Sequence, residues 1–107
     1  MTFIAMNRFR VALGREADFE TVWRNRESDL PTTPGFVAFH LLRGPSDEQM
    51  TLFASHTIWE SKKHFEDWTR SEAFRRAHAG APKTAGLYLG PPQFEGFEVV
   101  TETAKAS

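Results

Sequence analysis

The chain has 107 residues and a formal net charge of −1. This length suits one domain with a small core, and the nearly neutral charge argues against a nucleic-acid-binding surface, which is normally strongly basic. The chain has no cysteine, which excludes disulfides, thiol nucleophiles and cysteine metal ligands.

The sequence carries no sign of membrane insertion or secretion. No stretch approaches the roughly 18 continuous apolar residues of a membrane span. The N-terminus leads directly into a predicted strand, without the basic and apolar segments of a secretory signal, which favours a cytoplasmic location. Ten Phe and three Trp are present, and such residues either fill a core or line a pocket for a flat apolar ligand.

The first predicted strand, residues 2–11, alternates between two faces. Because side chains in a strand repeat every second residue, Asn7 shares a face with four apolar residues, Phe3, Ala5, Phe9 and Val11. That face is predicted to be buried, and a buried amide without a partner costs roughly 1–3 kcal/mol. Asn7 therefore needs a hydrogen-bonding partner, either a nearby backbone group or something in the helical layer under this face, where Trp68 and His78 are the candidates.

The remaining elements follow from hydrophobic period and turn residues. Ser61 is expected to cap a second helix, and Ser71 to break that helix into two pieces. The predicted elements after the first strand are a helix over 16–30, strands over 36–43 and 50–59 joined by a turn, helical pieces over 62–70 and 71–79, a long loop over 80–92 and a last strand over 94–101.

This order of elements predicts an α+β fold of the ferredoxin-like type, an antiparallel sheet with helices on one face. Residues 1–101 are expected to form the single domain, and residues 102–107 a polar tail. The first strand is apolar on both faces, whereas the helices can cover only one. A second copy of the chain is the simplest cover for the other face, so we expect a homodimer.

Trp68 and His78 are two candidate ligand-binding side chains on the second helical segment. On an unbroken helix they would point about 80° apart and lie roughly 15 Å apart along the axis, but a break at Ser71 allows both to face one pocket. His78 follows Phe74 by four residues and is therefore expected on the same face. Structural explanations also exist, since His78 suits a helix C-terminus and Trp68 can pack in the core against Phe65.

Arg26 lies in register with the apolar stripe of the predicted 16–30 helix, three residues after Trp23. Its side chain can extend to solvent, or its guanidinium can pair with a ligand carboxylate. His40 and His56 lie on neighbouring predicted strands, but no third ligand at a suitable spacing supports a metal site there.

The sequence resembles the IsdG-type haem-degrading monooxygenases of the antibiotic biosynthesis monooxygenase superfamily, whose members are dimeric ferredoxin-like barrels. Asn7, Trp68 and His78 match the catalytic trio of these enzymes, and Arg26 resembles an arginine found in some of them. The loop after Gly80 departs from the family pattern, which leaves the tetrapyrrole product and its regiochemistry open. The resemblance covers most of the chain and is carried by residues 3–8, 34–36, 57–61 and 65–78.

The resemblance implies that haem is both substrate and cofactor. His78 would be the metal ligand that binds the haem iron, Asn7 would hydrogen-bond the oxygen species on the opposite side, and Trp68 would distort the macrocycle. With O₂ and electrons from a reductase or small reductant, the ring would open and release iron. The other haem-binding side chains would be Arg26, Phe65 and Phe74.

Two other functions remain open at this point. The first is a cofactor-free monooxygenase that acts on a quinol-like aromatic substrate, in which Asn7 and Trp68 would orient the substrate and stabilise its anion. The second is a non-enzymatic haem-binding or haem-storage protein.

Overall fold

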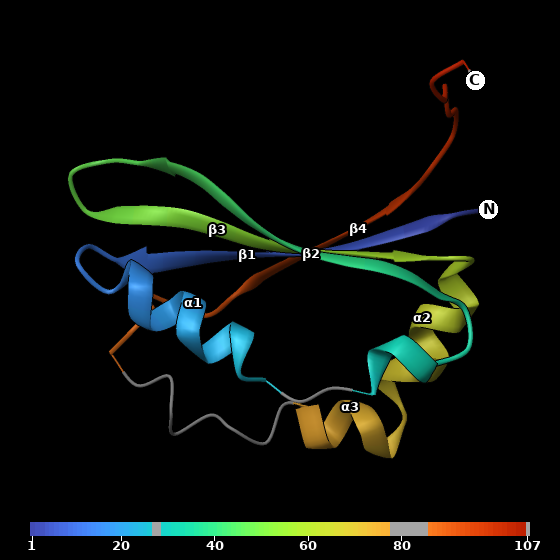
Figure 1. The fold of residues 1–107 in the computed structure, drawn as a ribbon, viewed down its shortest axis with the longest axis horizontal. Helices are drawn as coiled ribbons and strands as arrows, with labels where there is room; N and C mark the ends of the chain where they lie inside the picture. The colour runs from blue at the N-terminus through green and yellow to red at the C-terminus, as the bar shows by residue number, and fades with distance from the viewer. Residues whose placement is uncertain (27–28, 78–85, 107) are drawn as a thin grey trace.

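The computed structural model describes residues 1–26, 29–77 and 86–106. It contains a four-stranded antiparallel sheet with the strand order β2-β3-β1-β4, and all of its described helices lie on one face of that sheet (Figure 1). The elements are β1 (Phe3–Ala12), α1 (Glu16–Arg24), a 3-10 turn (Leu30–Thr32), β2 (Phe36–Ser46), β3 (Met50–Trp59), α2 (Lys62–Thr69), α3 (Glu72–Ala77) and β4 (Gln93–Glu98).

The predicted ferredoxin-like α+β sandwich is confirmed, but the first helix is shorter than predicted. It ends at Arg24 instead of residue 30, and the backbone N–H of Asn25 donates to the carbonyl of Thr21 at 3.0 Å. The sequence between Trp23 and Leu30 is polar, so no apolar side chain is available to hold a further turn on the sheet.

Two aromatic clusters form the core, one under each end of the helical layer. Under α1, Phe19 packs on Phe53 with ring centroids 4.6 Å apart. Under α2, Phe65 and Trp68 pack against the fully buried Trp59. The buried members are Phe9, Val11, Phe19 and Phe53 in the α1 cluster, and Phe3, Ala5 and Trp59 in the α2 cluster.

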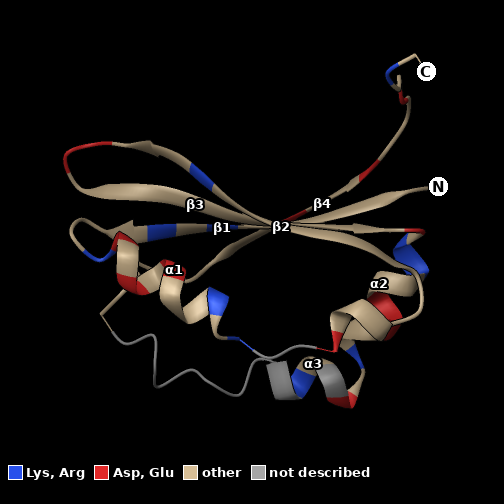
Figure 2. Cartoon of the chain, viewed as in Figure 1, with Lys and Arg blue, Asp and Glu red and all other residues tan. Residues whose placement is uncertain are grey.

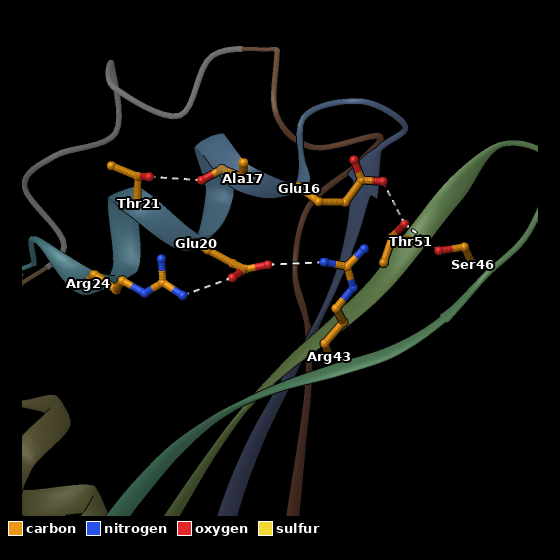
Figure 3. Close-up of polar contacts among 8 residues, drawn as sticks. All are labelled: Glu16, Ala17, Glu20, Thr21, Arg24, Arg43, Ser46 and Thr51. Carbon is orange, nitrogen blue, oxygen red and sulfur yellow. Dashed lines mark hydrogen bonds and ion pairs between the residues drawn. The ribbon is translucent and has the colours of Figure 1, made fainter.

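Charged side chains suit the dipole of α1 and tie this helix to the sheet. Acidic residues occupy its first turn and Arg24 its last turn (Figure 2), an arrangement that the helix dipole favours. The Glu20 carboxylate accepts from Arg24 at 3.1 Å and from Arg43 of β2 at 3.2 Å (Figure 3). Exposed pairs of this kind contribute little stability, so the buried Phe19 ring is the main attachment of the helix.

Serine caps set the course of the second helical segment, as predicted. The Ser61 hydroxyl accepts from the backbone N–H of His64 at 3.2 Å and begins α2. The Ser71 hydroxyl accepts from the N–H of Phe74 at 3.2 Å and donates to the carbonyl of Trp68 at 2.6 Å. Ser71 therefore joins the end of α2 to the start of α3, and the predicted break is confirmed.

The described part of the predicted 80–92 loop is attached to β1. The backbone N–H of Ala12 donates to the carbonyl of Leu87 at 2.8 Å, and the N–H of Leu89 donates to the carbonyl of Arg10 at 2.9 Å. The Leu87 side chain is fully buried. Residues 86–92 thus continue the β4 side of the sheet along β1, whereas residues 80–85 lie outside the described residues.

Two glycines with positive φ provide a matched test of the turns. Gly14 has φ of 84° and Gly35 has φ of 81°, so alanine at either position costs roughly 1–2 kcal/mol. A Cβ at Gly35 would also overlap the His64 ring, which is held by the Ser61 hydroxyl at 2.7 Å, whereas no described atom lies within 4 Å of a Cβ at Gly14.

We therefore expect Gly35→Ala to lower the free energy of unfolding clearly more than Gly14→Ala. Urea unfolding followed by circular dichroism measures both losses. Equal losses would contradict a close approach between Gly35 and His64.

Candidate functional site

A cavity of about 570 Å³ lies between the sheet and the helical layer. Its floor is formed by side chains of β1 and β3 at the centre of the sheet, namely Ala5, Asn7, Ser55 and Thr57. These side chains are small or polar, whereas the same strand face carries large aromatic side chains on either side of them, namely Phe3 and Trp59 at one end and Phe9 and Phe53 at the other. The cavity therefore exists because small side chains occupy the floor between two filled regions.

The wall of the cavity is largely aromatic and apolar. Phe65 of α2 and Phe94 of β4 stack with centroids 5.5 Å apart and an interplanar angle of 5°. Trp23 and Phe39 stack in the same way, 5.7 Å apart at 13°. The complete wall consists of Trp23, Arg26, Leu30, Pro31, Phe36, Phe39, Trp59, Phe65, Trp68, Thr69, Phe74 and Phe94.

Trp68 enters this wall from α2 and is half-buried. Its ring centroid lies 5.5 Å from that of Trp59 and 4.8 Å from that of Phe74, to which it is nearly perpendicular at 88°. The Ser71 cap brings Phe74 to this position because it starts α3 at the carbonyl of Trp68. The predicted break in the helix thus places Trp68 and Phe74 around the same cavity.

Arg26 provides the positive charge at the cavity. It follows the end of α1, and its guanidinium carbon lies 4.6 Å from the centroid of the Trp23 ring. Burial lowers the pKa of Arg26 from its ordinary value, because a charged group loses hydration there. Burial likewise raises the pKa of the nearby Tyr88 phenol. A desolvated guanidinium beside an aromatic ring suits a carboxylate that belongs to a flat apolar ligand.

The structure brings five of the predicted site residues to this one cavity, which is lined by Asn7, Arg26, Phe65, Trp68 and Phe74. His78 lies outside the described residues. Arg26 reaches the cavity from the turn after α1. The sequence analysis placed it on the apolar stripe of a longer helix, and that placement was wrong. The functional roles assigned to all six residues stay predictions.

Sequence reasoning missed the contribution of β3 to the site. Ser55 and Thr57 are buried on the floor of the cavity, and they share a strand face with Trp59. The signal was present in the segment Thr51–Trp59, where three hydroxyl side chains share a strand face with Phe53 and Trp59. The same logic that selected Asn7 on β1 applies to these residues.

The other candidate features are weaker. His40 and His56 are neighbours on β2 and β3 with ring centroids 5.8 Å apart, but no cluster of three potential metal ligands occurs among the described residues. In the part of the chain that the structure describes, no helix combines the length and apolar character needed to cross a membrane.

Residues 2–80 match the antibiotic biosynthesis monooxygenase family. The chain belongs to this family. The family assignment made from the sequence is thereby confirmed, and the match includes the segment that carries Trp68 and His78.

Curated relatives within the family have names that refer to haem. The chain is 36% identical over 67 residues to a haem-degrading monooxygenase of Shouchella clausii. The aligned segment covers 62% of this chain and 63% of that protein. It is 31% identical over 80 residues to a mycobilin-producing haem oxygenase of Mycobacterium tuberculosis, and this alignment covers 75% of this chain and 73% of that protein. The chain therefore matches a little under two thirds of the Shouchella protein.

Solved structures agree with the fold. The haem degrader MhuD of Mycobacterium tuberculosis, with two haems bound in its active site, matches with a TM-score of 0.73 and 29% identity over 95% of this chain and 99% of that one. SnoaB of Streptomyces nogalater, a cofactor-independent oxygenase, matches with a TM-score of 0.67 and 19% identity over 97% of this chain and 98% of that one. The second similarity concerns the fold alone.

The two tryptophans that meet at the cavity are expected to differ in their contribution to stability. Trp59 is fully buried among aromatic rings, so Trp59→Ala should cost about 3–5 kcal/mol. Trp68 is half-buried and borders the cavity, so Trp68→Ala should cost clearly less. Chemical unfolding of both variants measures the difference. A loss at Trp68 as large as that at Trp59 would assign Trp68 to the core.

Proposed function

We propose that the protein is an enzyme that degrades haem, with haem serving as both substrate and cofactor. The observation that carries this proposal is the shared cavity, which is lined by Asn7 from the sheet and Trp68 from α2 and has a largely aromatic wall. The curated relatives named as haem-degrading enzymes support the same reaction class.

The cavity suits haem in size and in chemistry. Its volume of about 570 Å³ lies within the range of about 300–1,000 Å³ that is usual for small-molecule sites. Haem is a flat apolar ring that carries two carboxylates, and the cavity offers flat aromatic side chains together with the desolvated Arg26 guanidinium. A charge-assisted pair between Arg26 and one carboxylate would orient the ring.

Each proposed residue contributes a different physical effect. Bound haem supplies an iron atom at which O₂ can be activated with external electrons. Asn7 and Trp68 both line the cavity; Asn7 would offer an amide hydrogen-bond donor from the floor, and Trp68 would place its indole ring against the ligand from the helical layer. His78 is proposed as the iron ligand on the basis of its spacing from Trp68, and ligation requires its neutral imidazole. The aromatic wall would limit the access of water to a bound ring, which would strengthen the hydrogen bond from Asn7.

A haem titration followed by reduction tests this function. Added hemin should give a stoichiometric Soret band, and an electron donor in air, with catalase present to remove free peroxide, should abolish that band as the ring opens. A protein that gives no Soret band would be assigned to the oxygenases that act without a cofactor. A Soret band that persists through aerobic reduction would identify a haem carrier.

The same titration tests the iron ligand. His78→Ala should shift the Soret band and weaken haem binding, because the variant lacks the proposed axial imidazole. His40→Ala is the matched control, since His40 lies on β2 and is not a cavity residue. An unchanged band position and affinity in His78→Ala would remove His78 from the site.

We also propose that two copies of the chain associate through the sheet face opposite the helices. The helices leave that face uncovered (Figure 1). On it, Ile4 lies between Ile58 of β3 and Phe97 of β4, and Phe97 is 45% exposed. Ile4 and Ile58 are half-buried, so the three side chains form an apolar row across three strands. An apolar patch at the surface is typical of an interface, and a second copy would complete the predicted dimeric barrel.

Light scattering at micromolar concentration should therefore give twice the chain mass of 12.2 kDa. Ile58→Glu should give monomers, because it places a charge in the middle of the apolar row. Leu13→Glu is the control, since Leu13 is exposed in the turn after β1 and lies outside this row. A monomeric wild-type protein would eliminate the barrel.

The electron donor is proposed to be a reductase or a small reductant, because the reaction consumes electrons that the described residues do not supply. The cytoplasmic location expected from the sequence stays a prediction.

A further inference from the structure

β3 carries three buried polar side chains on the face that the helices cover, and their surroundings differ. Thr51 is fully buried and has protein partners, since it donates to the Glu16 carboxylate at 3.0 Å and lies 2.7 Å from the Ser46 hydroxyl (Figure 3). Ser55 and Thr57, which are 4% and 9% exposed, line the cavity instead. Packing of α1 therefore explains Thr51 but leaves the other two hydroxyls unexplained.

The register of the sheet separates the roles of these two hydroxyls. Ser55 lies directly opposite Asn7 on β1, whereas Thr57 lies opposite Ala5. Directly opposite residues of an antiparallel pair have Cβ atoms about 4.5–5.5 Å apart, and both side chains project from the same side of the sheet. Among the described residues, neither the Asn7 amide nor the Ser55 hydroxyl makes a side-chain hydrogen bond in this structure, to each other or to a third group, although they face each other across the two strands.

The chemistry of an amide explains why such a neighbour matters. Asn7 has an acceptor oxygen and a donor NH₂ group, and a half turn about its last side-chain bond exchanges the two. Only one orientation presents the donor to a ligand in the cavity. A hydroxyl that donates to the amide oxygen favours that orientation, because it engages the oxygen and leaves the NH₂ group directed elsewhere.

We propose that Ser55 is a positioning residue: a rotation of its side chain from the position that it has in this structure lets the hydroxyl donate a hydrogen bond to the amide oxygen of Asn7, which directs the NH₂ group into the cavity. The pairing itself concerns the protein alone. Its catalytic consequence rests on the proposed haem-degrading function, in which a preorganised donor is effective because it needs no reorientation during the reaction.

The pairing is tested first on the protein without haem, through the rotation of the Asn7 side-chain amide. A hydrogen bond to an amide oxygen strengthens the partial double bond between carbon and nitrogen, so it slows the exchange of the two NH₂ protons that NMR measures. Ser55→Ala should speed this exchange several-fold. Ser55→Thr, which restores a hydroxyl, should return it to near the wild-type rate.

Thr57→Val is the matched control, because it removes the neighbouring floor hydroxyl, which faces Ala5 and not Asn7. The exchange at Asn7 should stay at the wild-type rate in this variant. An unchanged exchange rate in Ser55→Ala, or an equal acceleration in Thr57→Val, would overturn the proposal.

A double-mutant cycle on the rate of haem degradation tests the consequence. Asn7→Ala should slow turnover by roughly 10²-fold or more, and Ser55→Ala should slow it about fivefold to tenfold, as expected for one hydrogen bond. In the Asn7→Ala background, Ser55→Ala should have no further effect. An equal slowing in both backgrounds would show that Ser55 acts independently of Asn7 and would overturn its positioning role.

The two experiments separate the two proposals. If the protein binds no haem, the proposed function fails, whereas the amide exchange rates still decide whether Ser55 pairs with Asn7. If haem is degraded and the exchange at Asn7 does not respond to Ser55→Ala, the function stands and the positioning role is wrong.

Discussion

The site depends on how the register of β1 against β3 distributes side-chain volume across the sheet. Phe9 faces Phe53, and Phe3 faces Trp59, so large side chains meet at both ends of the covered face. Between them lie the pairs Ala5–Thr57 and Asn7–Ser55, which are too small to reach the helical layer. A shift of the register by one residue would turn these side chains to the other face and would remove both the core and the cavity. Stability and the binding site therefore have the same origin in this sheet.

This arrangement places polar groups where a core would normally be apolar. The cavity contains the Asn7 amide, the floor hydroxyls and the Arg26 guanidinium, and burial lowers the pKa of Arg26. Removing such groups from bulk water is unfavourable unless a partner compensates. The aromatic clusters at both ends offset this cost, and the small α3 helix is held by the Ser71 cap and by the contact between Trp68 and Phe74. A site with several desolvated groups is the place where a protein gives up stability for function.

Sequence reasoning recovered the order of the elements, the break at Ser71 and the face on which Asn7 lies. Each of these follows from a local signal: side-chain period, a capping residue or a turn. It overestimated the length of α1, because it extended the helical period as far as Leu30 although the residues between Trp23 and Leu30 are polar. It also treated residues 80–92 as one loop, whereas Leu87 is buried and its carbonyl accepts a hydrogen bond from Ala12. Pairing between distant segments leaves no local periodicity in a short stretch.

The sequence by itself determined the class of fold, the family and the polar exception at Asn7, since these depend on alternation and on motifs that are contiguous along the chain. Only the tertiary structure decided that Asn7, Arg26 and Trp68 border one cavity, and that Ser55 lies opposite Asn7. The physical reason is that strand register and the approach of a helix to a sheet are set by contacts between residues far apart in the sequence. These contacts cannot be recognised from the order of residues along the chain, and they become visible only in the folded sheet.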